Sequence, residues 1–148
     1  MKKIAGLLFC LTMMFASAAS ALDPVYTPVF SNKAIRGYDT VAYFTQNEAV
    51  EGKAEFSTEY LGATWLFSSA EHLALFEQNP EEYAPQYGGY CAWAVSQNYT
   101  ASVEPEQFKI VDGKLYLNYN EEIKERWLGS YREFIEQADK NWPALLEE

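Results

Sequence analysis

The sequence predicts an α+β fold, in which short β-hairpins pack on short helices within one small domain. Three observations support this prediction. The chain has 148 residues, which suits one domain and leaves little room for two. Strand-like runs joined by two-residue turns occur twice, and helix-capping residues follow each of them. Hydrophobic residues make up 49% of the chain and charged residues 22%, so it can bury a core rather than stay disordered.

Residues 1–21 have the pattern of a bacterial secretory signal peptide. Lys2 and Lys3 form a positive n-region, residues 4–15 form an apolar stretch, and residues 19–21 form a small-x-small cleavage site. The apolar stretch is short for a membrane span, and no stop-transfer segment follows it. We therefore expect a periplasmic or secreted protein with no stable membrane anchor after cleavage.

The mature chain is expected to begin with an extended lead-in. Residues 22–33 contain two prolines and little periodicity, and the domain proper is expected to cover residues 34–148. Near its start, Asp39 and Arg36 flank Gly37. A salt bridge between the two side chains, or an Asx-turn made by Asp39, is expected here rather than a catalytic role.

Two strands are expected next, at residues 54–60 and 63–67. Both are rich in aromatic residues that suit a half-buried pleated surface, and Leu61-Gly62 joins them. Ser68 predicts the start of a helix, because Glu71 stands three residues later as in a capping box.

Two short helices are expected after this one. Asn79 followed by Pro80 predicts the end of one helix and the start of another, with proline at the first helical position. Residues 92–95 are expected to form a further short helix.

A second hairpin is expected in the second half of the chain. Asp112-Gly113 lies between the strand-like segments 107–111 and 114–117, which predicts a type I′ turn. Asn120 predicts the cap of a helix that runs over residues 121–127.

The chain is expected to end in a helix that docks on the domain. Ser130 and Glu133 have the spacing of a second capping box. Phe134, Ala138 and Trp142 follow at intervals of four residues, which places them on one helix face.

Charge and motifs exclude several classes of function. The chain has 11 Lys and Arg against 21 Asp and Glu, a net charge of −10, which argues against nucleic acid and against anionic membrane surfaces as partners. It has no glycine-rich phosphate loop, paired-histidine metalloprotease motif or nucleophile elbow. No recognisable catalytic motif is present, so whether the protein is an enzyme stays open.

Cys91 is the strongest candidate functional residue. Once the signal peptide is removed it is the single cysteine, so an internal disulfide cannot form. A thiolate is both a nucleophile and a metal ligand, and the neighbouring Gly88-Gly89 could expose it and direct backbone N–H groups at it. The alternative is a buried cysteine that packs as a small hydrophobic residue.

His72, the single histidine, is the second candidate. It could orient or deprotonate Cys91, or share a transition-metal ion with it, so that Cys91 and His72 would be the metal ligands. A closed tetrahedral zinc site needs about four such ligands, so a monomer would have to add carboxylates. The alternative is a partly exposed surface histidine.

Five residues near the glycine pair are candidate binding residues: Tyr43, Tyr87, Gly88, Gly89 and Tyr90. The tyrosines could line an aromatic pocket in which their hydroxyls position a ligand. The alternative, which we favour, is a small core that places tyrosines at its wet edge.

Three stretches of the chain resemble the exported YHS domain-containing (seleno)protein family. They are RGYDTVAYF at 36–44, YLGATWLFSS at 60–69 and PEEYAPQYGGYCA at 80–92. The resemblance covers nearly all of the mature chain and implies a YHS, treble-clef-like fold. Some members of the group carry selenocysteine, which the resemblance places at the position of Cys91.

The resemblance implies metal binding less firmly than it implies the fold. The wider YHS family is associated with metal handling, and its better-known members carry several cysteines. This chain has residues 39–42 where those members place a cysteine after Asp-Pro, and Ser68 and Ser69 where they have paired cysteines. It also lacks the name-giving Tyr-His-Ser tripeptide.

Three functions remain open at this point. The first is an exported binding or redox module whose Cys91 thiol contacts a metal ion or an oxidised partner, either a protein or a small molecule. The second is a structural or protein-interaction module in which Cys91 is only a core residue. The third is a thiol-dependent enzyme that acts on a small oxidant. Exposure and acidity of Cys91 would distinguish them, and any redox cycle would need an external resolving thiol.

Overall fold

The computed structural model describes residues 21–148, so the expected signal peptide lies outside the described residues except for Ala21. The described chain confirms the α+β prediction, with helices and two separate antiparallel hairpins, β1–β2 and β3–β4. The elements in chain order are η1 (Ala34–Gly37), α1 (Thr40–Thr45), β1 (Lys53–Tyr60), β2 (Ala63–Phe67), α2 (Ala70–Gln78), α3 (Pro80–Tyr83), η2 (Gln86–Gly89), α4 (Ala92–Ser96), β3 (Phe108–Val111), β4 (Lys114–Leu117), α5 (Glu121–Leu128) and α6 (Tyr131–Glu147).

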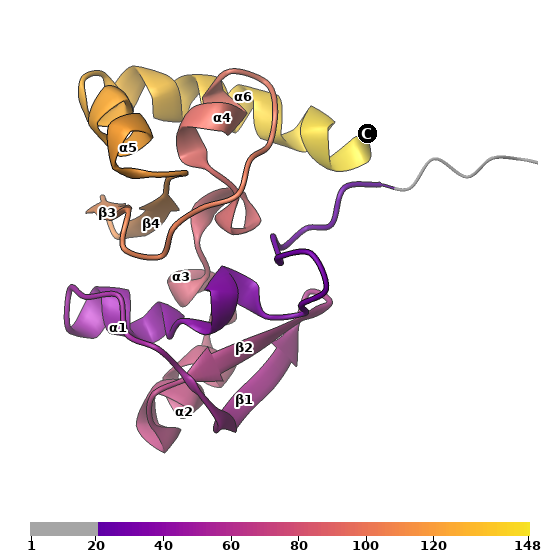
Figure 1. Ribbon diagram of the computed structural model, residues 1–148, viewed down its shortest axis with the longest axis vertical. Helices are drawn as coiled ribbons and strands as arrows, with labels where there is room; N and C mark the ends of the chain where they lie inside the picture. The colour runs from indigo at the N-terminus through magenta and orange to yellow at the C-terminus, as the bar shows by residue number, and fades with distance from the viewer. Residues whose placement is uncertain (1–20) are drawn as a thin grey trace, which may run out of the picture.

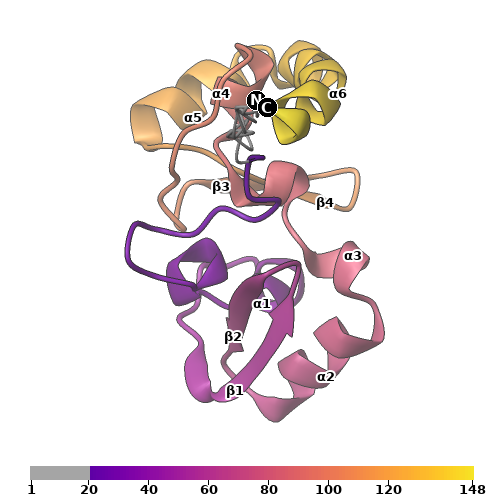
Figure 2. The same cartoon turned by 90° about the vertical axis from the view of Figure 1, so that its right-hand side faces the viewer.

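The elements are arranged in two halves stacked along the long axis. Figure 1 shows β1, β2, α1 and α2 in one half, and β3, β4, α4, α5 and α6 in the other. Figure 2 shows α3 on the path that leads from one half to the other. One cluster of buried side chains includes Phe67 and Phe76 in the first half and reaches Cys91 and Leu117 in the second. A second cluster, which includes Trp127, lies under α6.

The first hairpin forms as expected. Tyr60 pairs with Ala63, and the two turn residues between them have φ values of 50° at Leu61 and 80° at Gly62. Positive φ at both central positions is the requirement of a type I′ turn. On the buried side, the ring of Trp65 stacks on Phe76 at 5.0 Å between ring centroids, which fixes α2 against the sheet.

Asp39 caps α1 instead of pairing with Arg36. Its Oδ1 accepts hydrogen bonds from the backbone N–H groups of Val41 at 2.9 Å and Ala42 at 3.2 Å. The expected Asx-type geometry is confirmed and the expected salt bridge is wrong. The guanidinium of Arg36 donates to the carbonyl of Val103 at 3.4 Å, while the Asp39 carboxylate is fully buried among other donors.

The helix α2 begins one residue later than the capping-box pattern predicts. Ser69, not Ser68, is the cap, and its Oγ accepts from the backbone N–H of His72 at 3.1 Å. The two donors of Ser68, its N–H and its Oγ–H, go instead to Oδ2 of Asp39 at 2.8 and 2.6 Å. Because the buried carboxylate of Asp39 needs several hydrogen-bond donors, Ser68 donates to it and does not cap the helix.

The second hairpin and the helix after it confirm their sequence signals. Val111 pairs with Lys114, and Asp112 and Gly113 have φ values of 51° and 75°, as a type I′ turn requires. Asn120 caps α5, since its Oδ1 accepts from the backbone N–H of Ile123 at 2.9 Å.

The helix α6 docks by the expected face but lacks the expected capping box. Ala138 is fully buried, and Phe134 and Trp142 pack on the same cluster. Ser130 occupies the cap position, but its side chain makes no cap hydrogen bond. Ser130 is exposed at the surface, where water can satisfy the first N–H groups of the helix, so that cap interaction is not needed.

Within residues 21–148, no helix combines the length and the apolar character that crossing a membrane would need.

Candidate functional site

Cys91 lies in the second half of the molecule, directly before α4. Its backbone N–H donates to the carbonyl of Ala101 at 3.0 Å, and its carbonyl accepts from the N–H of Val95 at 3.0 Å. The far end of α4 is held by α6, because the side-chain amide of Asn141 donates to the carbonyls of Val95 at 2.9 Å and Ser96 at 3.2 Å. Backbone contacts therefore fix the position of the thiol from both sides.

The Cys91 side chain forms part of the wall of a cavity of about 350 Å³, here called the thiol pocket. Cys91 itself is only 1% exposed, so its neighbours cover the sulfur almost completely. Tyr99 and Tyr119, which also line the pocket, are 47% and 49% exposed. The other lining residues are Trp93, Ala94, Ala101, Asn120, Glu122 and Ile123. Most of the lining side chains are apolar or aromatic.

Asn118 is the hydrogen-bond partner of the thiol. Its Oδ1 lies 3.5 Å from Cys91 Sγ and 3.1 Å from the backbone nitrogen of Trp93, so it accepts from both groups. Asn118 is 1% exposed, and its backbone is held by hydrogen bonds with Gln107 and Glu104. The thiol thus has a fixed acceptor for its proton.

Burial and backbone dipoles act on the thiol in opposite directions. Burial raises the pKa of Cys91, because a thiolate is poorly solvated there. The backbone N–H groups of Ala94, Tyr119 and Trp93 lower the pKa, because they favour the negative sulfur. Burial is the larger influence, so the pKa lies above its ordinary value and the resting form is the thiol.

His72 lies in the other half of the molecule and does not meet Cys91. In Figures 1 and 2, α2 and α4 lie in opposite halves. His72 is buried rather than partly exposed, with Nδ1 2.6 Å from Oδ2 of Asp39 and Nε2 3.3 Å from Oγ1 of Thr45. Among residues 21–148, no group of three or more His, Cys, Asp or Glu side chains is placed to hold a metal ion.

Gly88 serves the docking of the lead-in rather than the exposure of the thiol. Its carbonyl accepts from the N–H of Tyr26 at 2.9 Å, and a Cβ at Gly88 would lie 1.9 Å from the carbonyl oxygen of Pro24. Gly88 and Gly89 have φ values of 61° and 86°, which favour glycine. The amides that face Cys91 come from α4 and Tyr119 instead.

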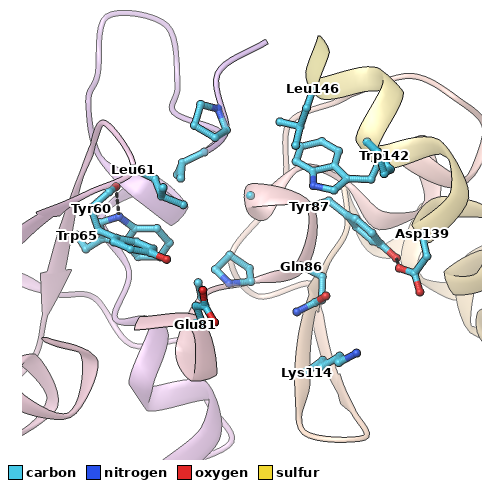
Figure 3. Close-up of a pocket in the computed structure, with 16 residues that line it drawn as sticks. Tyr60, Leu61, Trp65, Glu81, Gln86, Tyr87, Lys114, Asp139, Trp142 and Leu146 are labelled. Carbon is cyan, nitrogen blue, oxygen red and sulfur yellow. Dashed lines mark hydrogen bonds between the residues drawn. The ribbon is translucent and has the colours of Figure 1, made fainter. Parts of the chain in front are cut away.

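The hydroxyl of each of the three candidate tyrosines is held by the protein itself. Tyr43 donates to the carbonyl of Pro105 at 2.7 Å, Tyr87 to Oδ1 of Asp139 at 2.8 Å and Tyr90 to the carbonyl of Asp23 at 3.0 Å. Burial raises the pKa of all three phenols. All three are core residues, and Tyr87, together with Gly88, also lines a cleft between the two halves (Figure 3).

A comparison with known protein families gives one match, which covers part of the chain. The model of the YHS domain matches residues 41–87. The chain contains a YHS domain. Within the fold, the YHS domain runs from α1 through the first hairpin to η2. It ends four residues before Cys91, so the thiol pocket is built by the segment that follows the YHS domain. Searches of curated proteins and of solved structures gave no match.

Sequence reasoning proposed Cys91 as a candidate residue but did not predict the residues that surround it. Asn118 follows directly after the β4 strand and carries no motif of its own. Its role depends on the hairpin β3–β4 lying beside α4, a tertiary relationship that spacing along the chain does not encode. Tyr99 and Tyr119 come to line the same pocket through the same relationship.

Proposed function

We propose that this YHS domain protein is an exported thiol module, in which Cys91 forms a mixed disulfide with a small oxidised partner that enters the thiol pocket. The observation that carries the proposal is that Cys91 is one of the residues lining a cavity of about 350 Å³, with the Asn118 acceptor and backbone N–H groups beside its thiol. A cysteine needed only for packing has no need of such a cavity.

The reaction is a thiol–disulfide exchange. The Cys91 thiol loses its proton and the sulfur attacks one sulfur of a low-molecular-weight disulfide, RS–SR. The RS–SR bond breaks as the new S–S bond to Cys91 forms, and the leaving RS⁻ takes up a proton. Cys91 is the free cysteine of the described chain, so an external thiol must reduce the mixed disulfide.

The backbone amides around the sulfur support this chemistry. The N–H groups of Ala94, Tyr119 and Trp93 favour negative charge on the sulfur at the moment of attack. Because burial keeps the resting thiol protonated, the thiolate fraction at neutral pH is small and the reaction is expected to be slow without a bound partner.

The size of the partner follows from the burial of the sulfur. With 1% of Cys91 exposed, the surface of a folded protein cannot bring a disulfide within bonding distance. The pocket volume of about 350 Å³ lies within the range of about 300–1,000 Å³ that is usual for small-molecule sites. The separation of Cys91 from His72 gives a shared metal site no support.

The alternative is a structural or protein-interaction module. One observation favours it: Cys91 belongs to the same buried cluster as Phe67 and Phe76, which holds the two halves together. In that case the pocket is a surface hollow and the thiol is inert.

One experiment distinguishes the thiol module from the structural module. The folded protein is exposed to 2-hydroxyethyl disulfide, and its intact mass is then measured. We expect one adduct at Cys91 in the wild-type protein and none in Cys91→Ala. Ala101→Phe, which fills the pocket, should lower the rate of adduct formation, while Ala144→Phe on the exposed side of α6 should leave that rate unchanged. An adduct that forms only in urea, or equal rates in both phenylalanine variants, would overturn the proposal.

Export is tested separately from the thiol chemistry. The full chain, expressed in a bacterium, should be recovered from the periplasm or medium as a protein that begins at Leu22. Recovery of a cytoplasmic protein that still begins at Met1 would show that the first residues are not a cleaved signal.

A further inference from the structure

A continuous row of tyrosine and tryptophan rings runs through the cluster of side chains under α6. Each ring packs on the next with centroids between 5.5 and 6.0 Å apart, a distance typical of aromatic side chains in contact. The two ends of the row are half-buried, while rings inside it are buried. In order of contact the rings are Tyr26, Tyr90, Trp142, Tyr87, Tyr116, Trp127 and Tyr131.

The composition of this row has a chemical consequence, because none of its rings is a phenylalanine. Tyrosine and tryptophan lose one electron far more readily than phenylalanine does, so rings of these two kinds can exchange an electron when they are in contact. The aromatic packing around α2 differs, since Trp65 stacks on Phe76 and Phe76 packs on Phe67. A ring at either end of the row that loses an electron can therefore take one from its inner neighbour.

Tyr87, in the middle of the row, has a proton acceptor of its own. Its hydroxyl lies 2.8 Å from Oδ1 of Asp139 (Figure 3), and the carbonyl of Ile135 lies further away at 3.5 Å. Asp139 is exposed on α6, so a proton that it receives can pass on to water. By contrast, the hydroxyl of Tyr90 donates to the backbone carbonyl of Asp23, which is too weak a base to take the proton.

The charges beside the row favour oxidation of Tyr87 over oxidation of Tyr131. Nζ of Lys109 and Cζ of Arg132 lie 5.6 and 5.3 Å from the ring centroid of Tyr131. Positive charge at this distance holds electrons in the Tyr131 ring and makes it harder to oxidise. The negative charge of Asp139 has the opposite effect on Tyr87. An oxidised Tyr131 ring is therefore expected to draw an electron from further along the row.

We propose that Tyr87 is a redox-active tyrosine, oxidised by an outer-sphere one-electron oxidant, such as a metal complex, that meets the row at its half-buried ends. The oxidant gains one electron, which leaves Tyr87 through the neighbouring rings. The phenol O–H bond of Tyr87 breaks, and its proton moves to the carboxylate of Asp139, which becomes a carboxylic acid. The product is a neutral tyrosyl radical, sheltered from solvent because Tyr87 is only 5% exposed. No thiol takes part in this step, so the proposal does not depend on Cys91.

The test is oxidation of the folded protein with tris(bipyridine)ruthenium(III), generated by a light flash and followed by freezing and EPR spectroscopy. Ring-deuterated tyrosine narrows the spectrum of a tyrosyl radical and so identifies it. We expect a tyrosyl signal in the wild type that is almost completely lost in Tyr87→Phe. The matched control is Tyr43→Phe, which should keep the signal. Tyr43 is also buried, but its hydroxyl donates to a carbonyl and its ring packs on Phe108.

A second pair of variants tests the proton acceptor. Asp139→Asn keeps the shape of the side chain and an oxygen that accepts a hydrogen bond, but the amide cannot take the proton. We expect the radical to form in lower yield and to decay faster in this variant. Glu136→Gln, also exposed on α6, is the matched control and should behave as the wild type does. Both changes are at exposed positions, so they test the proposal even if Tyr87→Phe does not fold.

Three outcomes would overturn the proposal. The first is that the wild-type protein gives no tyrosyl signal. The second is that folded Tyr87→Phe keeps the signal, which would place the radical on another tyrosine. The third is that Asp139→Asn and Glu136→Gln have the same yield and decay of the radical. Cys91→Ala should give the wild-type signal, so failure of the thiol proposal leaves this test intact.

Discussion

The carboxylate of Asp39 and the imidazole of His72 form a buried pair that joins α1 to α2, with Nδ1 of His72 2.6 Å from Oδ2 of Asp39. The same carboxylate caps α1 through its other oxygen and receives both donors of Ser68. One side chain therefore fixes the start of α1, the end of β2 and the first turn of α2. The pair holds the first half of the fold together rather than the thiol site.

Replacement of Asp39 should destabilise the protein strongly. Asp39→Ala removes a helix cap, worth about 1 kcal/mol, and leaves buried donors unsatisfied at about 1–3 kcal/mol, so we expect a loss of roughly 3 kcal/mol in the free energy of unfolding. The control is Glu136→Ala, which breaks an exposed pair with Lys140 worth about 0–1 kcal/mol. Urea unfolding measures both. Equal losses in the two variants would show that the buried pair is not a structural anchor.

Gly88→Ala should release the lead-in. The new methyl group would meet the Pro24 carbonyl oxygen at 1.9 Å, so residues 22–26 would have to move away. Gly113→Ala is the matched control, because Gly113 has a similar positive φ of 75° but open space around it. We expect a cost of about 1–2 kcal/mol for the control, from its backbone conformation alone, and a larger cost for Gly88→Ala.

Limited proteolysis gives the second readout for this pair of variants. Cleavage near residues 22–26 should become faster in Gly88→Ala and stay unchanged in Gly113→Ala. If the two variants have the same stability and the same cleavage pattern, the close approach of Gly88 to Pro24 does not contribute to the stability of the protein.

The two fully buried tryptophans should respond differently to phenylalanine. The indole N–H of Trp65 donates to the carbonyl of Tyr60 at 3.0 Å, whereas that of Trp127 is buried without a partner in the described chain. Trp65→Phe removes the indole hydrogen bond to the Tyr60 carbonyl, while Trp127→Phe removes an unsatisfied donor. We expect Trp65→Phe to cost roughly 1–3 kcal/mol more than Trp127→Phe in denaturant unfolding. The reverse order would contradict the hydrogen-bond assignment.

Stability should fall in alkaline solution. Burial and the nearby Asp139 and Asp112 carboxylates raise the pKa of Tyr116 to about 12, above its ordinary value of about 10. Between these two values the unfolded chain releases the phenol proton and the folded chain keeps it, so rising pH favours unfolding. Melting temperatures from pH 9 to 12 should therefore fall less steeply in Tyr116→Phe than in the wild type. Tyr119→Phe, at an exposed site, serves as the control, and identical slopes in all three proteins would refute this account.

Local signals along the chain were sufficient to predict much of the fold. Leu61-Gly62 and Asp112-Gly113 each require positive φ at two successive residues, and few structures other than a tight hairpin meet that requirement. Asn120 likewise caps the helix that begins directly after it. In each case the interaction partners lie within a few residues of one another, so the pattern contains the information.

The parts that the sequence did not predict depend on distant partners. Ser68 has the same local signal as Ser69, and the choice between them is made by Asp39, almost thirty residues earlier. The setting of Cys91 likewise depends on Asn118 in the following hairpin. Such relationships arise when the elements pack together, and no period or spacing along the chain indicates them.

The most direct test of the central claim is the alkylation of Cys91 in the folded mature protein, followed by intact mass. Two reagents are compared, iodoacetamide and a maleimide attached to a long polymer. The account predicts that iodoacetamide labels the folded protein through the thiol pocket, with a rate that still rises with pH above the ordinary cysteine pKa of about 8.5, while the bulky reagent labels only the denatured chain. If iodoacetamide also reacts only after denaturation, Cys91 is a core residue and the thiol function is contradicted.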